Sequence, residues 1–352
     1  MLIADVLKRQ NNNLNVIRLW LAFAVIVEHL FVFINQPVQK FPIETLWPFT
    51  SGGHIAVVVF FFLSGLLVTN SLVETQNIKR YCVDRFLRIY PAFFICLVVS
   101  AVVCFFFSSL ALTTYVKPAS TYIFHNLFIS YQASIEDVSF MREGFPLDGQ
   151  YASAINGSLW VILHQVKLYI LLAVLYWLAT RIKGKEKEFL SITFLIGLFA
   201  PFLFPNQILV ENSVKALSLV SCFSFGGLLA LYKDRVTLDW RMPVTLFVLG
   251  YLLSGYISQL CFFCAFCSFC LLVSTLKVIR AIPLKIDISY SVYLYGWFVQ
   301  QLVQYFLFPY VNYCSYALIC IAFSCVIGLI SYYGVEYPLA KLAQKLNKHL
   351  SP

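Results

Sequence analysis

Charged side chains are scarce in this sequence. Only 12% of its 352 residues are Asp, Glu, Lys or Arg, whereas 61% are hydrophobic and the mean hydropathy is +0.81. Such a composition excludes a water-soluble domain of this size and predicts an all-α, polytopic membrane protein. The sequence also lacks a soluble catalytic domain, a low-complexity linker and a detectable internal repeat. We therefore expect a single membrane domain over residues 1–352, in which any chemistry takes place.

Acidic residues are the scarcer charged class, with 16 against 25 basic residues and a net charge of +9. Most of the basic residues fall in connections, so the excess charge predicts topology rather than nucleic-acid binding. The hydrophobic runs predict about ten transmembrane helices, each about long enough to cross a bilayer core of roughly 30 Å. Their expected ranges are 14–36, 55–73, 90–111, 157–180, 188–204, 213–232, 243–258, 260–276, 288–308 and 314–335.

An even number of spans puts both termini on one side of the membrane. The positive-inside rule assigns that side to the cytoplasm, because most of the basic residues then lie there. The segment at about 339–350 places leucine and lysine at helical spacing, which predicts an interfacial helix on anionic lipid. The longest connection, about 112–156, is then external and long enough to suggest a function.

Four cysteines at intervals of three, Cys261, Cys264, Cys267 and Cys270, resemble a repeated metal-binding motif. On a helix, however, each step of three residues turns the side chain by about −60°, so the four spread over half the circumference. They cannot converge on one ion while the helix is intact. We expect packing residues here and no metal site.

Two polar residues interrupt the first hydrophobic run. His29 follows Arg18 by eleven positions, which returns a helix to within roughly 20° of the same face and separates the two by about 16 Å. A polar side chain inside a bilayer costs free energy, so its presence there usually indicates a function. A histidine suits general-base chemistry because its pKa lies near operating pH. The alternative is a buried neutral histidine bonded to a neighbouring helix.

A second cluster precedes the third expected span, whose start Pro91 suits. Arg85 and Arg88 are one helical step apart and form one patch, which together with Arg18 would make a basic funnel at the cytoplasmic surface. Arginine forks suit phosphate oxygens. The alternative interpretation is positive-inside anchoring. In the run before Gly65, Ser64 offers a hydroxyl, which would act as a nucleophile only beside a base.

Polar residues also enter two later spans. In the fourth, Trp160 suits the external interface, and the polar residues His164, Gln165 and Lys167 follow it into the bilayer, where we expect them to line a cavity. In the ninth, tyrosines and glutamines over residues 289–301 suggest a polar wall. An aromatic interfacial belt is the alternative explanation for that segment.

In this order, these blocks resemble the acyltransferase 3 family of integral membrane acyltransferases, over nearly the whole chain. The resemblance rests on six motifs, none specific alone. They are Arg18 with His29, Phe61 to Gly65, Arg85 with Arg88 and Pro91, Asn156 to Trp160, Ile288 to Leu294, and Glu336 with Pro338.

The resemblance implies O-acetylation of a sugar in a surface polysaccharide, such as lipopolysaccharide, or in its lipid-linked precursor, by a multi-pass protein of the bacterial inner membrane. The donor would be cytosolic acetyl-CoA and His29 the catalytic group. The donor site would hold Arg18, Arg85, Arg88, Ser64 and Tyr90. The acceptor site would hold Asn156, Trp160, His164, Lys167, Tyr290 and Tyr293. Partners besides substrates would be membrane lipids, with no nucleic acid.

One position departs from the family pattern. The family usually has Glu five residues after the Trp of its fourth block, and this sequence has Gln165. The amide keeps the shape but loses the charge and the ability to accept a proton. Two other interpretations therefore stay open: a transporter or flippase for a lipid-linked or anionic solute, which also suits polar residues at the midplane, and a catalytically silent family member.

Overall fold

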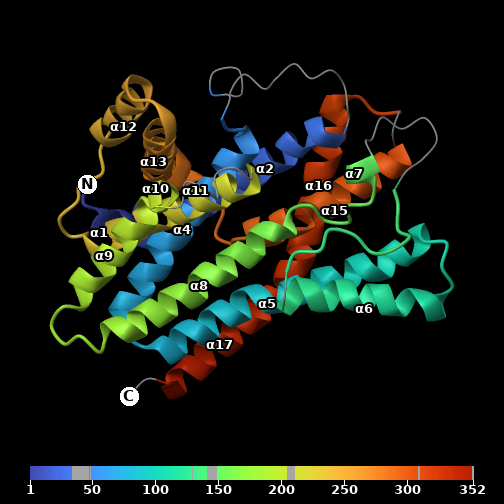
Figure 1. Cartoon of the computed structure of the whole chain (residues 1–352), viewed down its shortest axis with the longest axis horizontal. Coiled ribbons are helices and arrows are strands. Elements are labelled where there is room, and N and C mark those ends of the chain that lie inside the picture. Colours follow the sequence, from blue (N-terminus) through green and yellow to red (C-terminus); the bar gives the residue numbers. More distant parts are fainter. Residues whose placement is uncertain are drawn as a thin grey trace. The chain divides into compact units, whose positions relative to one another are not determined.

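The computed structural model describes residues 1–33, 47, 49–128, 130–140, 149–203, 211–307 and 310–350. These residues form helices and contain no β-strand, which confirms the all-α prediction (Figure 1). The longer helices are α2 (Leu14–Phe33), α4 (Gly52–Thr75), α5 (Ile78–Cys104), α6 (Leu112–Phe128), α8 (Leu159–Ala179), α9 (Glu186–Leu198), α11 (Glu211–Leu231), α12 (Arg241–Leu252), α13 (Gly255–Ser274), α15 (Ser289–Leu307), α16 (Tyr313–Ser331) and α17 (Tyr337–Leu350). Short helices are α1 (Ile3–Val6), α7 (Gly149–Ala152), α10 (Ala200–Leu203) and α14 (Lys277–Ala281).

Five helical segments of the described chain are long and apolar enough to cross a membrane: Gly52–Thr75, Ile78–Phe107, Leu159–Ala179, Gly255–Ser274 and Tyr313–Lys348. Each of the ten expected ranges overlaps at least one helix, and residues 34–36, 204 and 308 of these ranges lie outside the described part. Two of these helices are short, with 13 residues in α9 and 12 in α12. At about 1.5 Å per residue they extend roughly 20 Å, less than a bilayer core. Ten spans with cytoplasmic termini remain a prediction.

Two predicted boundaries are wrong. The third span was expected to begin near Pro91, but α5 begins at Ile78 and continues through this proline. Proline is common in the first turn of a helix, which suggested a start there, but here Pro91 lies inside the helix. The seventh range, 243–258, includes a break, because α12 ends at Leu252 and α13 begins at Gly255, whose φ of +65° favours glycine.

The amphipathic segment near the C-terminal end is helical, as predicted. It forms α17, which begins at Tyr337, two residues before the expected start. The Asn347 amide is buried and donates to the Asp84 carboxylate of α5 at 2.7 Å. This bond joins α17 to α5, and the position of α17 at a lipid surface remains a prediction.

The chain divides into two compact units. One takes its described residues from 1–21, 43–81 and 167–287, and the other from 22–42, 82–166 and 288–352. In the first unit, α4 and α11 approach closely where a Cβ at Gly65 would collide with the Phe223 carbonyl oxygen, and one at Gly226 would collide with that of Phe62. Glycine at both positions lets the two backbones come together.

The second unit is built around α15, which carries three buried glutamines. The amide of Gln300 donates to the Ile26 carbonyl of α2 at 2.8 Å, and that of Gln304 donates to Phe33 at 2.6 Å. Away from water, a polar group is costly unless it has a partner. Gln300 and Gln304 therefore hold the second half of α2 in a defined register against α15. That residues 1–352 act as one domain remains a prediction.

Candidate active site

His29 lies on the half of α2 that belongs to the second unit. Its ring meets the Trp297 ring edge to face, with centroids 4.7 Å apart, and the Gln300 side chain lies beside it. The Nδ1 atom is shielded from solvent and has no hydrogen-bond partner among the described residues. An imidazole nitrogen placed in this way can accept a proton from a substrate.

The Trp297 ring is held by the segment that leads into α8. Its indole Nε1 donates to the Ala154 carbonyl at 2.9 Å, and the neighbouring Gln301 amide donates to the same carbonyl at 2.8 Å. A Cβ on Gly157 would come within 2.6 Å of the indole ring, so only glycine fits there without a shift. These contacts fix the aromatic wall beside His29.

Two residues expected at the acceptor site support this same segment. The buried Asn156 side chain donates to the Leu294 carbonyl at 2.8 Å, and the Tyr293 hydroxyl donates to the Ser158 carbonyl at 3.1 Å. Both side chains therefore connect the segment to α15. In the preceding loop the Tyr131 hydroxyl donates to the Asn156 carbonyl at 3.2 Å, and burial raises the pKa of Tyr131 to about 12.

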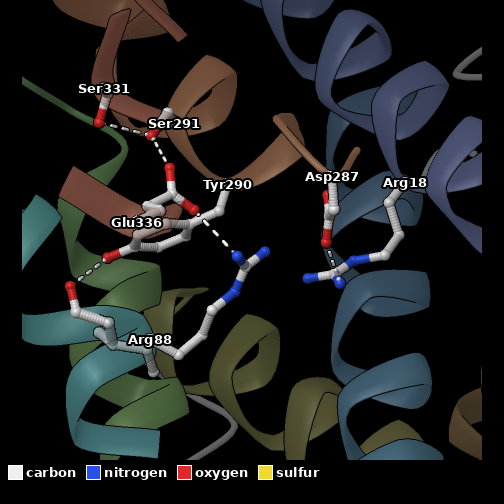
Figure 2. Close-up of polar contacts among 8 residues, drawn as sticks. Arg18, Arg88, Asp287, Tyr290, Ser291, Ser331 and Glu336 are labelled. Atoms are coloured by element: carbon white, nitrogen blue, oxygen red, sulfur yellow. Dashed lines mark hydrogen bonds and ion pairs between the residues drawn. The ribbon is translucent and has the colours of Figure 1, made fainter. Parts of the chain in front are cut away.

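Arg88 of α5 forms an ion pair with Glu336, at 3.0 Å between Nη1 and Oε2 (Figure 2). The Glu336 side chain is 1% exposed and that of Arg88 is 30% exposed. Tyr290, another expected acceptor residue, donates its hydroxyl to the Ile89 carbonyl at 3.0 Å. The Arg85 Nε is buried without a partner among the described residues, and the Tyr90 ring stacks on Phe86 at 5.0 Å.

Arg18 also has a carboxylate partner, within the first unit. Its Nη1 lies 2.5 Å from an Asp287 oxygen, and the side chains are 23% and 15% exposed (Figure 2). Ser64, expected at the donor site, is buried on α4 next to Gly65 in the crossing with α11. The arginines of the expected donor site are therefore not isolated cations: two of the three are paired.

The polar residues of α8 differ in exposure. His164 is half-buried and its Nδ1 lies 2.8 Å from the Trp160 carbonyl, while its ring meets the Trp160 ring at 5.3 Å. Gln165 is half-buried and Lys167 is exposed. Residues two apart on a helix point in nearly opposite directions, so Gln165 and Lys167 face different surroundings. Their shared role in a cavity remains a prediction.

The comparisons with known proteins agree with the motif pattern. The family model described as an acyltransferase domain, acyltransferase 3, matches residues 11–333. The chain belongs to the acyltransferase 3 family. This acyltransferase is 24% identical over 323 residues to the O-acetyl transferase of Shigella phage Sf6, covering 84% of this chain and 86% of that protein.

This acyltransferase is also 27% identical over 231 residues to nodulation protein 10 of Rhizobium leguminosarum bv. viciae, covering 64% of this chain and 61% of that protein. The chain thus aligns with less than two thirds of the nodulation protein. No solved structure matches. Family membership and several long apolar helices identify a multi-pass membrane protein of an acyltransferase family.

Some residues of this acyltransferase gain importance only from the structure. Trp297 and Gln300 are the neighbours of His29, and Asp287 and Glu336 are the partners of two expected donor arginines. Glu336 belongs to a family motif, but the motif assigns it no partner. A search of the sequence for acidic residues at the ends of apolar helices would have found Asp287 and Glu336. It would not have shown which arginine each carboxylate pairs with.

Proposed function

We propose that this acyltransferase transfers an acetyl group from cytosolic acetyl-CoA to a sugar hydroxyl of a surface polysaccharide or its lipid-linked precursor. The observation that carries the proposal is the shielded Nδ1 of His29, which has no partner among the described residues and lies beside Trp297 and Gln300. The phage relative bears the name O-acetyl transferase, which supports acetyl as the group transferred.

In the proposed reaction, His29 accepts the proton of the sugar hydroxyl while its oxygen attacks the thioester carbonyl. The carbon–sulfur bond then breaks, and the CoA sulfur leaves with the electron pair. The imidazolium returns its proton to that sulfur, so the histidine ends neutral. The reaction forms one ester bond and consumes one thioester bond, with no net change in protonation of the protein.

The donor is proposed to bind through its phosphates to Arg18, Arg85 and Arg88, with Ser64 and Tyr90 nearby. An arginine has five N–H groups in a planar fork. Pairing with one carboxylate oxygen therefore takes up only part of the hydrogen-bonding capacity of such a fork. Such charge-assisted bonds are about twice as strong as neutral ones.

The acceptor is proposed to approach from the opposite side, where Asn156, Trp160, His164, Lys167 and Tyr293 would contact it. Tyr290, expected with them, instead bonds to Ile89 beside Arg88 of the proposed donor site. Asn156 and Tyr293 would act mainly by holding the segment beside Trp297, because their side chains already bond to backbone carbonyls. This arrangement assumes the ten-span topology with cytoplasmic termini in the bacterial inner membrane.

One observation favours a second candidate, a catalytically silent member of the family. Gln165 stands where the family usually has a carboxylate, and an amide cannot accept a proton. If the carboxylate assists His29, the chain as given would bind its substrates without turnover. A transporter or flippase would instead move a glycan lipid without modifying it.

The test uses the full chain in proteoliposomes, with acetyl-CoA labelled in the acetyl group and a glycan lipid from an O-acetylated surface polysaccharide. We expect alkali-labile label in the glycan and an equal amount of free CoA thiol. Binding of both substrates without label transfer would instead support the silent member. Translocation of the glycan lipid without any acetylation would support the transporter.

A further inference from the structure

We infer that the hydroxyl pair Ser291 and Ser331 positions Glu336 and, through it, the Arg88 guanidinium that receives the donor. The inference rests on the proposed function, in which Arg88 contacts the phosphates of acetyl-CoA. Both serines are positioning residues: neither is assigned a contact with substrate.

Each oxygen of the Glu336 carboxylate has its own partner. The Ser291 hydroxyl donates to Oε1 at 2.5 Å, and Arg88 Nη1 donates to Oε2 at 3.0 Å (Figure 2). The Ser331 and Ser291 hydroxyl oxygens lie 2.9 Å apart. With both oxygens engaged, the carboxylate plane cannot rotate without breaking one of these bonds.

The order of the protons follows from the chemistry of the groups. An ionised carboxylate only accepts hydrogen bonds, so the single proton of Ser291 goes to Glu336. The Ser331 hydroxyl, whose oxygen is 2.9 Å from that of Ser291, can then donate its own proton to the Ser291 oxygen. The result is a directed chain from Ser331 through Ser291 to Glu336 and Arg88, in which each bond polarises the next.

A π turn brings the two ends of this chain together. Residues Tyr332–Glu336 form a π-helix between α16 and α17, directly after Ser331. In an α-helix, residues five apart differ by about 140° around the axis, so Ser331 and Glu336 would face different directions. A π turn bonds residue i to residue i+5 and stacks them on one face. Both side chains can therefore reach Ser291.

Burial explains why the hydroxyls matter. Glu336 is 3% exposed, Ser291 is 0% exposed and Ser331 is 6% exposed. A buried carboxylate is destabilising unless its oxygens accept well-placed hydrogen bonds. The Arg88 side chain is 30% exposed, so Arg88 is the member of this cluster that a phosphate would meet first. The two serines hold the buried Glu336 carboxylate in place, so that the more exposed Arg88 guanidinium keeps one orientation.

The test compares Ser291→Ala and Ser331→Ala in the full chain, with acetyl-CoA and acetyl-pantetheine as alternative donors. Acetyl-pantetheine lacks the nucleotide and its phosphates. We expect Ser291→Ala to raise the KM for acetyl-CoA on the order of tenfold, the size of one hydrogen bond to a charged group. Ser331→Ala should raise it less. In both variants kcat and the KM for acetyl-pantetheine should stay within about twofold of the parent.

The matched control is Ser324→Ala on α16. The Ser324 hydroxyl is buried and has no partner among the described residues, and it lies two helical turns before Ser331. The substitution Ser324→Ala removes a hydroxyl from the same helix but leaves the hydrogen bonds of Ser331, Ser291, Glu336 and Arg88 intact. The KM values for both donors should therefore be unchanged. Ser291→Thr keeps a hydroxyl at this position, so it should retain most of the affinity for acetyl-CoA that Ser291→Ala loses.

The outcomes separate the inference from the proposed function. Equal KM values for acetyl-CoA in Ser291→Ala and the parent would overturn the inference, as would a loss in kcat that is the same for both donors. A parent that uses both donors equally well would contradict the proposed phosphate contacts and the inference with them. If the parent transfers no acetyl group, the same variants are compared by their Kd for CoA, and an unchanged Kd overturns the inference.

Discussion

Arg18 and Asp287 form an ion pair of 2.5 Å, although 269 residues separate them in the sequence. The pair joins the beginning of α2 to the segment that precedes α15. Arg18 is the permanent cation of the arginine–histidine motif, so its positive charge is largely balanced before any donor binds. An anionic donor therefore meets a hydrogen-bonding fork and not an isolated charge.

Exchanging the two charges separates the structural role of this pair from a donor-binding role. Arg18→Asp or Asp287→Arg alone leaves two like charges together in a partly buried place, which we expect to lower the melting temperature. The double variant should recover much of the stability but not the affinity for acetyl-CoA, because a carboxylate at position 18 repels phosphate. Thermal unfolding and the KM for acetyl-CoA are the measurements. Full recovery of both would assign Arg18 a purely structural role.

His29→Ala should abolish acetyl transfer while the protein still inserts and folds. If the imidazole removes the proton of the sugar hydroxyl, its loss should cost on the order of 100-fold or more in kcat. The matched control is His125→Ala on α6, outside the proposed site, which should leave kcat unchanged. Label transfer and monodispersity in detergent are measured side by side. A well-folded His29→Ala protein with the parent's rate would contradict the mechanism.

Gln165→Glu tests the departure from the family pattern. A carboxylate there can hold a positive charge or accept a proton, which the amide cannot do. We expect the variant to raise acetyl transfer, or to restore it if the chain as given is inactive. The measurement is acetyl incorporation into the glycan by both forms under the same conditions. Equal rates, or a faster Gln form, would show that the departure is neutral.

The close crossing of α4 and α11 depends on glycine at two positions. Gly65→Ala and Gly226→Ala each place a methyl group against a backbone carbonyl of the other helix, which cannot move aside as a side chain can. We expect each to destabilise the protein by about 1–3 kcal/mol. Gly334→Ala is the control, because a Cβ there meets nothing within 4 Å. If all three variants unfold at the same temperature as the parent, the packing of α4 against α11 does not depend on glycine at these positions.

Asp137 holds the loop after α6 to residues Ser108 and Ser109. The Ser109 hydroxyl and amide donate to its carboxylate at 2.6 and 2.9 Å, which lowers the pKa of Asp137 below its usual value. A lowered pKa means that this contact stabilises the loop above the ordinary pKa of Asp and is lost as the pH falls through the lowered value. At neutral pH, Asp137→Asn should therefore increase hydrogen exchange of the Ser109 amide. Unchanged exchange would contradict this role.

The local pattern of the chain predicts much of the fold. Apolar content and helical spacing place helices at all ten expected ranges, because helix formation depends on hydrogen bonds within one segment. The break before Gly255 escaped prediction because the surrounding residues are apolar on both sides. The continuation of α5 through Pro91 escaped prediction because proline is typical of a helix start and unusual in a helix interior.

The sequence by itself determined that this is an all-helical member of an acyltransferase family and that Arg18 and His29 share one face of a helix. Composition, spacing and motif order are enough for that, because they are properties of neighbouring residues. Only the tertiary structure decided which carboxylates pair with Arg18 and Arg88, and that Trp297 stands beside His29. Such contacts join segments hundreds of residues apart, and they depend on packing that no local pattern specifies.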